Sequence, residues 1–270
     1  MPMFRGRRIP KGYKVLKPVL PSAAIEDKYR VKLDAMIREM HDSVMYWIEA
    51  AYKNNEPRIA MDAAPAEVLR IAVARLMGRW TDRFNEASER LADYFAGDVE
   101  QRSSAELKKI LKDGGWTVKF KMTPAMRDVF QATVNQNVAL IKSIPSQYLS
   151  DVEGMVQRSV QAGRDLKQLT DDLENRYEIT RRRAKLIALD QNNKATASFT
   201  RARRIELGLF TNVWMHSHAG KEPRPTHVEM NGKTFDIRKG MWDSHEQEWI
   251  QPGYLIRCRC SSRPVVSGFS

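Results

Sequence analysis

Residues 180–208 contain the most strongly basic helix signal in the chain, TRRRAKLIALDQNNKATASFTRARRIELG. Thr180 is suited to cap the start of this helix. Gly208 is suited to end it, because glycine readily adopts the left-handed conformation that follows a last helical turn. Small and apolar side chains recur on one side at helical spacing, which predicts a buried face. The residues on that face are Ala184, Ile187, Gln191, Ala195, Ala202 and Ile205.

Basic residues crowd both ends of this helix, and within it only Asp190 and Glu206 oppose them. A solvated helix face explains such a charge density, and so does contact with phosphate or with an acidic protein surface. Phe199 is the one aromatic residue among these charges, which disfavours a platform for stacking single-stranded bases. The candidate contact residues are Arg181, Arg182, Arg183, Arg201, Arg203 and Arg204.

The first 22 residues are also basic, and no acidic residue occurs before Glu26. Four prolines in this stretch exclude a continuous helix, so we expect an extended basic arm over residues 1–22. Such an arm is either a solvated tail or a strap on nucleic acid or a partner subunit. Its cations are Arg5, Arg7, Arg8, Lys11, Lys14 and Lys17.

The composition is that of a folded protein with a polyanionic or acidic partner. The chain has 270 residues, 42% of them hydrophobic, and its 45 Lys and Arg exceed its 33 Asp and Glu, giving a net charge of +12. No run of about 18 apolar residues is present, so we expect no membrane span and no membrane partner. The amino-terminal stretch lacks the apolar core of a secretory signal. The two cysteines are separated by one residue, which argues against a disulfide framework and for a reducing compartment.

Residues 23–178 form a predicted helical region. Apolar residues recur at helical spacing in segments separated by Pro, Gly and turn residues. Residues 116–122 instead alternate between apolar and polar side chains, as an isolated strand would. We expect helices at 28–52, 65–97, 123–142, 147–161 and 166–177, with the first two packed as an antiparallel pair and Pro145 separating the third from the fourth.

After Gly208 the pattern changes to short strands and turns. Residues 213–215 are predicted as a strand, and Asn231-Gly232 is a strong signal for a two-residue hairpin loop. That register pairs Val228 with Phe235 and places Asp236 beside His227. With a final strand at Cys258-Arg259-Cys260, the predicted fold is mainly α with a small C-terminal α+β module spanning residues 179–270.

Four of the five histidines and both cysteines lie in the last 55 residues, and three interpretations of this cluster remain open. A structural zinc ion suits a mixed set of imidazoles and thiolates, with Asp236 orienting His227 from behind. Alternatively, His227-Val228-Glu229 followed by the cysteines partly resembles the H-x-E and P-C-x-x-C signature of zinc deaminases, with Glu229 as proton shuttle. In the third interpretation the residues only pack or cap turns. The candidate ligands are His216, His218, His227, Cys258 and Cys260.

From Arg182 onward the chain resembles the phage head morphogenesis family, the Mu F-like minor head proteins. An ordered series of short motifs carries this resemblance over about the last third of the chain. The motifs are residues 184–191 (AKLIALDQ), 207–209 (LGL), 214–217 (WMHS), 221–227 (KEPRPTH), 231–235 (NGKTF), 252–253 (PG) and 258–260 (CRC).

The resemblance implies a structural protein of a tailed-phage virion, not an enzyme. Such a protein is incorporated during procapsid assembly in the host cytoplasm. It is associated with the portal protein and other head proteins at the portal vertex or capsid interior, and it supports packaging or delivery of the genome with sequence-neutral DNA contact. The alternative function is that of a zinc-dependent enzyme acting on nucleic acid and packaged in the virion.

Overall fold

A computed structural model describes residues 12–54, 64–163, 165–218 and 222–267. The chain divides into two compact units, which are described separately. The first comprises Met1–Glu26, Tyr94–Val134 and Leu189–Ser270, and the second comprises Asp27–Asp93 and Asn135–Ala188. The boundaries expected from the sequence, after residues 22 and 178, do not coincide with this division. Of the helices in the described residues, none is long and apolar enough to cross a membrane.

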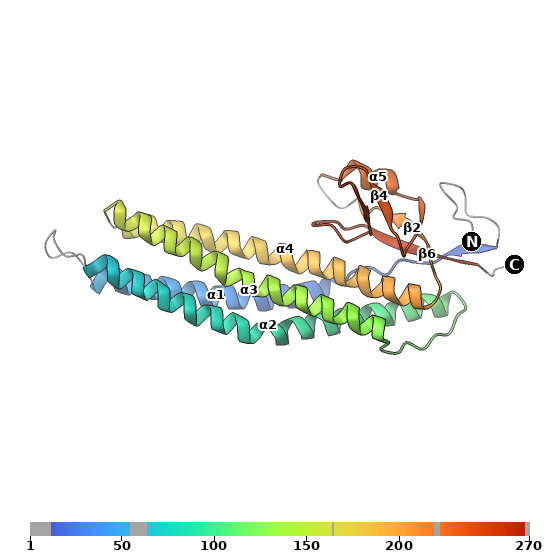
Figure 1. The fold of residues 1–270 in the computed structure, drawn as a ribbon, viewed down its shortest axis with the longest axis horizontal. Coiled ribbons are helices and arrows are strands. Elements are labelled where there is room, and N and C mark those ends of the chain that lie inside the picture. The colour runs from blue at the N-terminus through green and yellow to red at the C-terminus, as the bar shows by residue number, and fades with distance from the viewer. Residues whose placement is uncertain (1–11, 55–63, 164, 219–221, 268–270) are drawn as a thin grey trace. The chain divides into compact units, whose positions relative to one another are not determined.

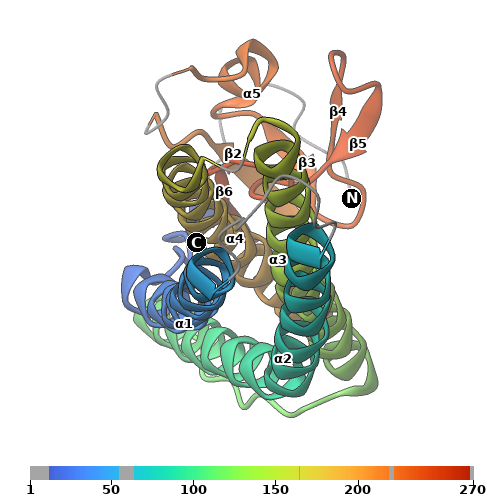
Figure 2. The same ribbon diagram turned by 90° about the vertical axis from the view of Figure 1, so that its left-hand side faces the viewer.

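Four long helices confirm that the protein is mainly α. They are α1 (Ala23–Asn54), α2 (Ala64–Asp113), α3 (Pro124–Gln161) and α4 (Leu166–Glu206). In the second unit, parts of all four lie side by side (Figures 1 and 2). Their buried faces follow the helical spacing of the sequence, as in the α1 series of Leu33, Ile37, Met40, Val44 and Ile48. Trp47, which the periodicity also placed in that series, is exposed.

A buried histidine joins three helices of this second unit. The Nδ1 atom of His41 in α1 lies 2.7 Å from the hydroxyl oxygen of Tyr148 in α3. The imidazole ring stacks on Tyr177 of α4 with centroids 4.3 Å apart, and its Nε2 atom lies 3.4 Å from a carboxylate oxygen of Glu174. Because a buried imidazole needs polar partners, these interactions restrict how the helices can pack.

Three expected helix ends are not ends in the structure. Gly97 lies inside α2 and Pro145 lies inside α3, so a single breaker residue does not terminate either helix. Thr180 lies inside α4, where its hydroxyl donates to the carbonyl oxygen of Arg176 instead of capping a new helix. In each case the apolar face continues past the breaker, and burial of that face outweighs the local penalty.

The helix ends that are confirmed have explicit caps. The hydroxyl of Thr123 accepts a hydrogen bond from the amide of Met126 at 3.2 Å, which caps the start of α3. Gly208 has φ of 72°, and the amides of Gly208 and Leu209 donate back to the carbonyls of Ile205 and Arg204. This pair of bonds is the Schellman arrangement expected after the last turn of α4.

The first unit contains a four-stranded antiparallel sheet in the order β1-β6-β2-β3 (Figure 1). Its strands are β1 (Tyr13–Val15), β2 (Thr211–Met215), β3 (Thr234–Asp236) and β6 (Ser261–Ser267). The β2 strand confirms the prediction at 213–215. A separate antiparallel hairpin is formed by β4 (Met241–Asp243) and β5 (Glu248–Ile250).

The described part of the expected basic arm is extended but belongs to this sheet. β1 pairs with β6, and the side chains of Leu16 and Val19 are buried in a cluster with Leu107, Ile110 and other residues at the end of α2. Trp116, Val118 and Phe120 pack against the same cluster. Residues 116–120 therefore alternate between the core and solvent, as the sequence suggested, whereas Met122 is exposed, and residues 116–122 form no strand.

The predicted hairpin at Asn231-Gly232 is wrong. Residues 225–230 form a short helix, α5 (Pro225–Met230), and β3 pairs with β2. Asn231 has φ of −55° and ψ of 129°, Gly232 has φ of 78°, and the amide of Lys233 donates to the carbonyl of Met230. These are the angles of a type II turn, which splays its two arms, whereas a two-residue hairpin favours types I′ and II′. The predicted strand at Cys258-Arg259-Cys260 is likewise a loop that precedes β6.

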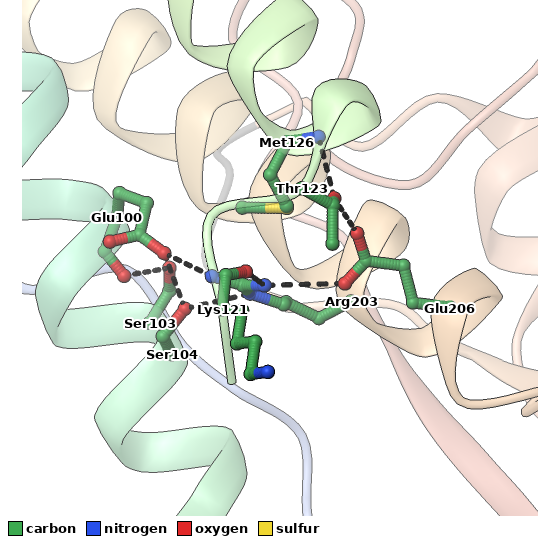
Figure 3. A network of polar contacts seen from close by, with 8 residues as sticks. All are labelled: Glu100, Ser103, Ser104, Lys121, Thr123, Met126, Arg203 and Glu206. Carbon is green, nitrogen blue, oxygen red and sulfur yellow. Dashed lines mark hydrogen bonds and ion pairs between the residues drawn. The ribbon is translucent and has the colours of Figure 1, made fainter. Parts of the chain in front are cut away.

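Two adjacent arginines near the end of α4 are buried in different parts of the first unit. Arg203 is 3% exposed and forms ion pairs with Glu100 of α2 at 2.9 Å and with Glu206 of its own helix at 3.2 Å (Figure 3). Its guanidinium also donates to the carbonyl of Lys121 at 2.5 Å and to the hydroxyl of Ser104 at 3.2 Å. Figure 3 shows that this one side chain connects α2, the segment before α3, and α4.

Arg204 is 1% exposed and faces the sheet. One of its terminal nitrogens donates to the side-chain oxygen of Asn212 at 3.0 Å and to the hydroxyl and carbonyl oxygens of Ser262 at 2.8 and 3.1 Å. Burial lowers the pKa of Arg204 to about 9. Arg204 thereby attaches the end of α4 to strands β2 and β6.

We predict that Arg203→Met lowers the free energy of unfolding by about 3 kcal/mol, because Glu100 and Glu206 lose the cation that compensates their partly buried charge. Urea denaturation followed by circular dichroism measures this loss. Arg127→Met is the control, since Arg127 is an exposed residue of the same unit and its replacement should cost no more than about 0.5 kcal/mol. Equal midpoints for the two variants would contradict the assigned role of Arg203.

Candidate metal centre

Three residues from two segments meet in the core of the first unit. His227 comes from α5, and Cys258 and Cys260 come from the loop before β6. The Nδ1 atom of His227 lies 3.5 Å from the Sγ atom of each cysteine. The three ligand atoms all lie within 4.8 Å of one another, and all three residues are buried.

These distances fit a tetrahedral metal ion. Zinc binds imidazole nitrogen at about 2.0–2.1 Å and thiolate sulfur at about 2.3 Å, and two such ligands at a tetrahedral angle are about 3.5 Å apart. One imidazole nitrogen has a single lone pair and cannot accept well-aligned S–H hydrogen bonds from two thiols at once. The two equal separations are compatible with an ion shared by the three atoms.

The other nitrogen of His227 faces a carboxylate. Its Nε2 atom lies 3.3 Å from an oxygen of Asp243, and the Asp243 side chain is fully buried. Burial alone raises the pKa of Asp243, but hydrogen bonds from the His245 amide, the Thr226 hydroxyl and the Glu246 amide together outweigh it, so the pKa is lowered. Asp243 is therefore an anion at neutral pH.

The two neighbouring thiols shift each other's pKa in opposite directions. Hydrogen bonding with Cys260 lowers the pKa of Cys258, against the opposing effect of burial. The same interaction raises the pKa of Cys260. Two cysteine side chains this close together are suited to bind one cation as thiolates.

Helix α4 holds the cysteine loop in place. Asp190 accepts a hydrogen bond from the amide of Arg257 at 2.7 Å, and the side-chain amide of Asn193 donates to the carbonyl of Cys258 at 3.2 Å. Gly253 approaches α4 closely with φ of 84°, and a Cβ atom there would lie 3.4 Å from that of Ala197. The loop that carries both thiols thus rests on a rigid element.

The short motifs noted in the sequence lie within a stretch that matches a known protein family. Residues 150–263 match the family described as "Phage Mu protein F like protein". Over these residues the chain is similar to the phage Mu F-like family. The matched stretch includes all of α4 and the three residues of the candidate centre, and it confirms the resemblance drawn from the sequence motifs.

One curated protein is similar to most of this chain. An uncharacterized protein of Haemophilus influenzae is 28% identical over 257 residues, which cover 93% of this chain and 55% of the relative. The chain therefore spans about half the length of this relative. No solved structure gives a significant match.

The Mu F-like module does not use the other predicted histidines in the same way. His216 is buried, but its Nδ1 atom accepts a hydrogen bond from the amide of His218 at 3.2 Å, and it is outside the three-residue group. Burial lowers the pKa of His216, and the neighbouring His218 and His227 lower it further. His218 itself is exposed and has φ of 52°.

Asp236 was predicted to lie beside His227, and that prediction is wrong. Its carboxylate pairs with Arg238 at 2.5 Å on the surface, because α5 replaces the strand that would have brought His227 opposite it. The residue that faces His227 is Asp243. Its position in an Asp-Ser-His turn, where an aspartate accepts backbone amides two and three residues ahead, was the available sequence signal.

The arginines predicted to contact DNA or a partner fall into two groups. Arg203 and Arg204 are buried and bonded within the chain, and Arg201 donates to the carbonyls of Ile237 and Arg238, so these three support the fold. The other group lies in the second unit, where Arg182 is exposed. There Arg181 pairs with Glu178, and Arg183 donates to Ser143.

Only some of the predicted cations of the basic arm lie within the described residues. Lys14 and Lys17 have exposed side chains on the segment that includes β1. Arg5, Arg7, Arg8 and Lys11 lie outside the described residues.

The deaminase-like alternative needs Glu229 near the metal. Glu229 is exposed, whereas His227 on the same short helix is buried. Two residues along a helix correspond to a rotation of about 200°, so these two side chains point to opposite sides. The geometry of α5 therefore does not assemble a zinc ligand and a proton shuttle at one site.

Proposed function

We propose that this protein is a minor head protein of a tailed phage, with a structural role at the portal vertex. The observation that carries the proposal is the Mu F-like match over residues 150–263. The candidate centre supports a structural role over a catalytic one, because its three residues are between 2% and 7% exposed and both cysteines belong to a hydrophobic core with Trp214, Phe235 and Ile250. A buried centre of this kind stabilises a module but leaves little room for a substrate.

The proposed partners are the portal protein and other head proteins, joined during procapsid assembly in the host cytoplasm and retained in the virion. The net charge of +12 supports this, since it favours association with an acidic protein surface or with packaged DNA. The role in the virion is to support genome packaging or delivery.

We predict that quantitative mass spectrometry detects the protein at a few copies in purified procapsids and virions. Procapsids assembled without portal protein are the matched control. The protein should be lost from them if it binds at the vertex, because its docking surface is then missing. Equal amounts in shells with and without portal would contradict a portal site, and absence from all particles would contradict a head function.

We also propose sequence-neutral DNA contact through the amino-terminal cations and not through the end of α4. Arg203 and Arg204 are unavailable to phosphate because they are buried and bonded internally. Lys14 and Lys17 are exposed and follow directly on the basic residues of the arm. Such contacts depend on counterion release and therefore on salt.

We predict that replacing Arg5, Arg7, Arg8 and Lys11 by alanine reduces the slope of log affinity against log salt by about 0.9 for each phosphate that the variant no longer neutralises. Fluorescence anisotropy with duplex DNA of random sequence measures this slope. Lys108→Ala with Lys109→Ala removes two exposed charges from α2 and should leave the slope unchanged. A wild-type protein that does not bind DNA at low salt would contradict the proposal.

We further propose that the ion held by His227, Cys258 and Cys260 is a structural zinc. A buried set of one imidazole and two thiolates suits zinc better than calcium or magnesium, which prefer oxygen ligands. The ion would join α5 to the loop before β6 and so close the C-terminal module.

We predict about one zinc per chain when the full protein is purified without chelator and analysed by mass spectrometry of the metal, since the three residues form one candidate site. Cys258→Ser with Cys260→Ser should abolish zinc retention. His245→Ala is the control, because the side chain of His245 is 80% exposed and lies outside the three-residue group, so its replacement should leave zinc in place. A wild-type protein that neither contains nor takes up zinc would refute this assignment.

A further inference from the structure

We propose that Asp243 is a positioning residue of the metal centre: it directs the Nδ1 atom of His227 toward the two thiols and ties the β4–β5 hairpin to the ion. This inference rests on the proposed zinc site for its metal readout. The proposed orientation of the His227 imidazole does not depend on which ion is bound.

The first step is the orientation of the His227 ring. Nδ1 lies 3.5 Å from both sulfurs, and Nε2 lies 3.3 Å from a carboxylate oxygen of Asp243. A neutral imidazole carries one proton, and a carboxylate favours that proton on the nitrogen nearest to it. Asp243 therefore leaves the lone pair of Nδ1 free to face Cys258 and Cys260, which is the arrangement a metal ligand requires.

The second step is that both oxygens of Asp243 face donors. Oδ1 accepts the amides of His245 at 2.9 Å and Glu246 at 3.3 Å. Oδ2 accepts the hydroxyl of Thr226 at 3.0 Å and faces Nε2 of His227. These interactions compensate a fully buried charge, which would otherwise be costly. Asparagine has the same shape but must turn its NH2 group toward one of these two sets of donors.

The third step is the coupling to the hairpin. Asp243 is the last residue of β4, and its Oδ1 atom holds the turn that leads to β5. Thr226 and His227 are consecutive residues of α5, and the side chains of both lie next to the Oδ2 atom of Asp243. A single carboxylate therefore connects the hairpin turn, the short helix and the candidate ligand. Binding of an ion at Nδ1 should consequently order the β4–β5 turn as well as the cysteine loop.

The decisive measurement uses the wild-type protein and needs no substitution. Long-range ¹⁵N–¹H correlation spectra of the ¹⁵N-labelled full chain report which nitrogen of His227 carries the proton. We expect a protonated Nε2 and an unprotonated Nδ1 both in chelator-treated protein and after addition of one equivalent of zinc. A proton on Nδ1 in the chelator-treated protein, or metal bound through Nε2, would overturn the proposal.

The second measurement is zinc affinity by competition with a chromophoric chelator. Asp243→Asn should weaken zinc binding about 10- to 100-fold, as is typical when a residue that orients a ligand histidine is replaced. Asp236→Asn is the matched control, because it makes the same chemical change on strand β3, where the carboxylate pairs with Arg238. Its affinity should equal that of the wild type. Equal affinity for the Asp243→Asn protein would refute the positioning role.

The two proposals fail in different ways. If wild-type protein binds no zinc, the structural-zinc proposal is refuted, while the proton on Nε2 of His227 still tests the orientation by Asp243. If zinc binds and the His227 spectrum shows the opposite nitrogen protonated, the zinc proposal survives and the role of Asp243 is refuted. If Asp243→Asn does not fold, the wild-type spectra still decide.

Discussion

The first unit depends on the polar partners of two neighbouring buried arginines of α4. Arg203 and Arg204 are almost completely buried, one with carboxylate partners from α2 and α4 and the other with amide, hydroxyl and carbonyl oxygens of the sheet. Burial of a guanidinium is costly unless polar groups compensate it, so these partners favour one position of the helix end. This preference links the position of the connecting segment at Lys121, the cap at Thr123 and the strands β2 and β6 to the end of α4.

The same helix also supports the candidate metal centre. About three to four turns before the arginines, Asp190 and Asn193 hold the loop that carries both thiols, and Gly253 of that loop packs against α4. His227 reaches the thiols from α5, and Asp243 reaches His227 from the β4–β5 hairpin. The centre thus joins the six-residue helix α5 to the loop before β6, and these segments contain little regular secondary structure. This is where a small module with a limited core gains most from a metal ion.

The burial of Arg203 and Arg204 limits which basic residues can contact DNA. Part of the excess of basic residues is neutralised inside the protein, so net charge alone overstates the surface available to DNA. The cations that remain exposed on the described part of the amino-terminal segment lie in or next to strand β1, which is paired with β6. Contact with a polyanion at that segment would therefore act on the sheet of the Mu F-like module and not on the buried arginines of α4.

Local signals in the amino-acid sequence were enough to specify the long helices, most of their buried faces, the cap at Thr123, the left-handed end at Gly208 and the family of the C-terminal module. Those signals are periodicity, capping preference and ordered short motifs. The sequence also singled out His227, Cys258 and Cys260, since few other chemistries use those residue types together. The continuation of α2, α3 and α4 through Gly97, Pro145 and Thr180 became evident only in three dimensions, because the burial gained along a helix is not visible at a breaker residue.

The folded arrangement was likewise needed to see that Asn231-Gly232 closes a helix, that Asp243 and not Asp236 faces His227, and that Arg203 and Arg204 point inward. For the charged residues the physical reason is the same. The sequence does not show whether an arginine or an aspartate is solvated by water or bonded to a buried partner. The side-chain partners of the two arginines lie up to 103 residues away along the chain.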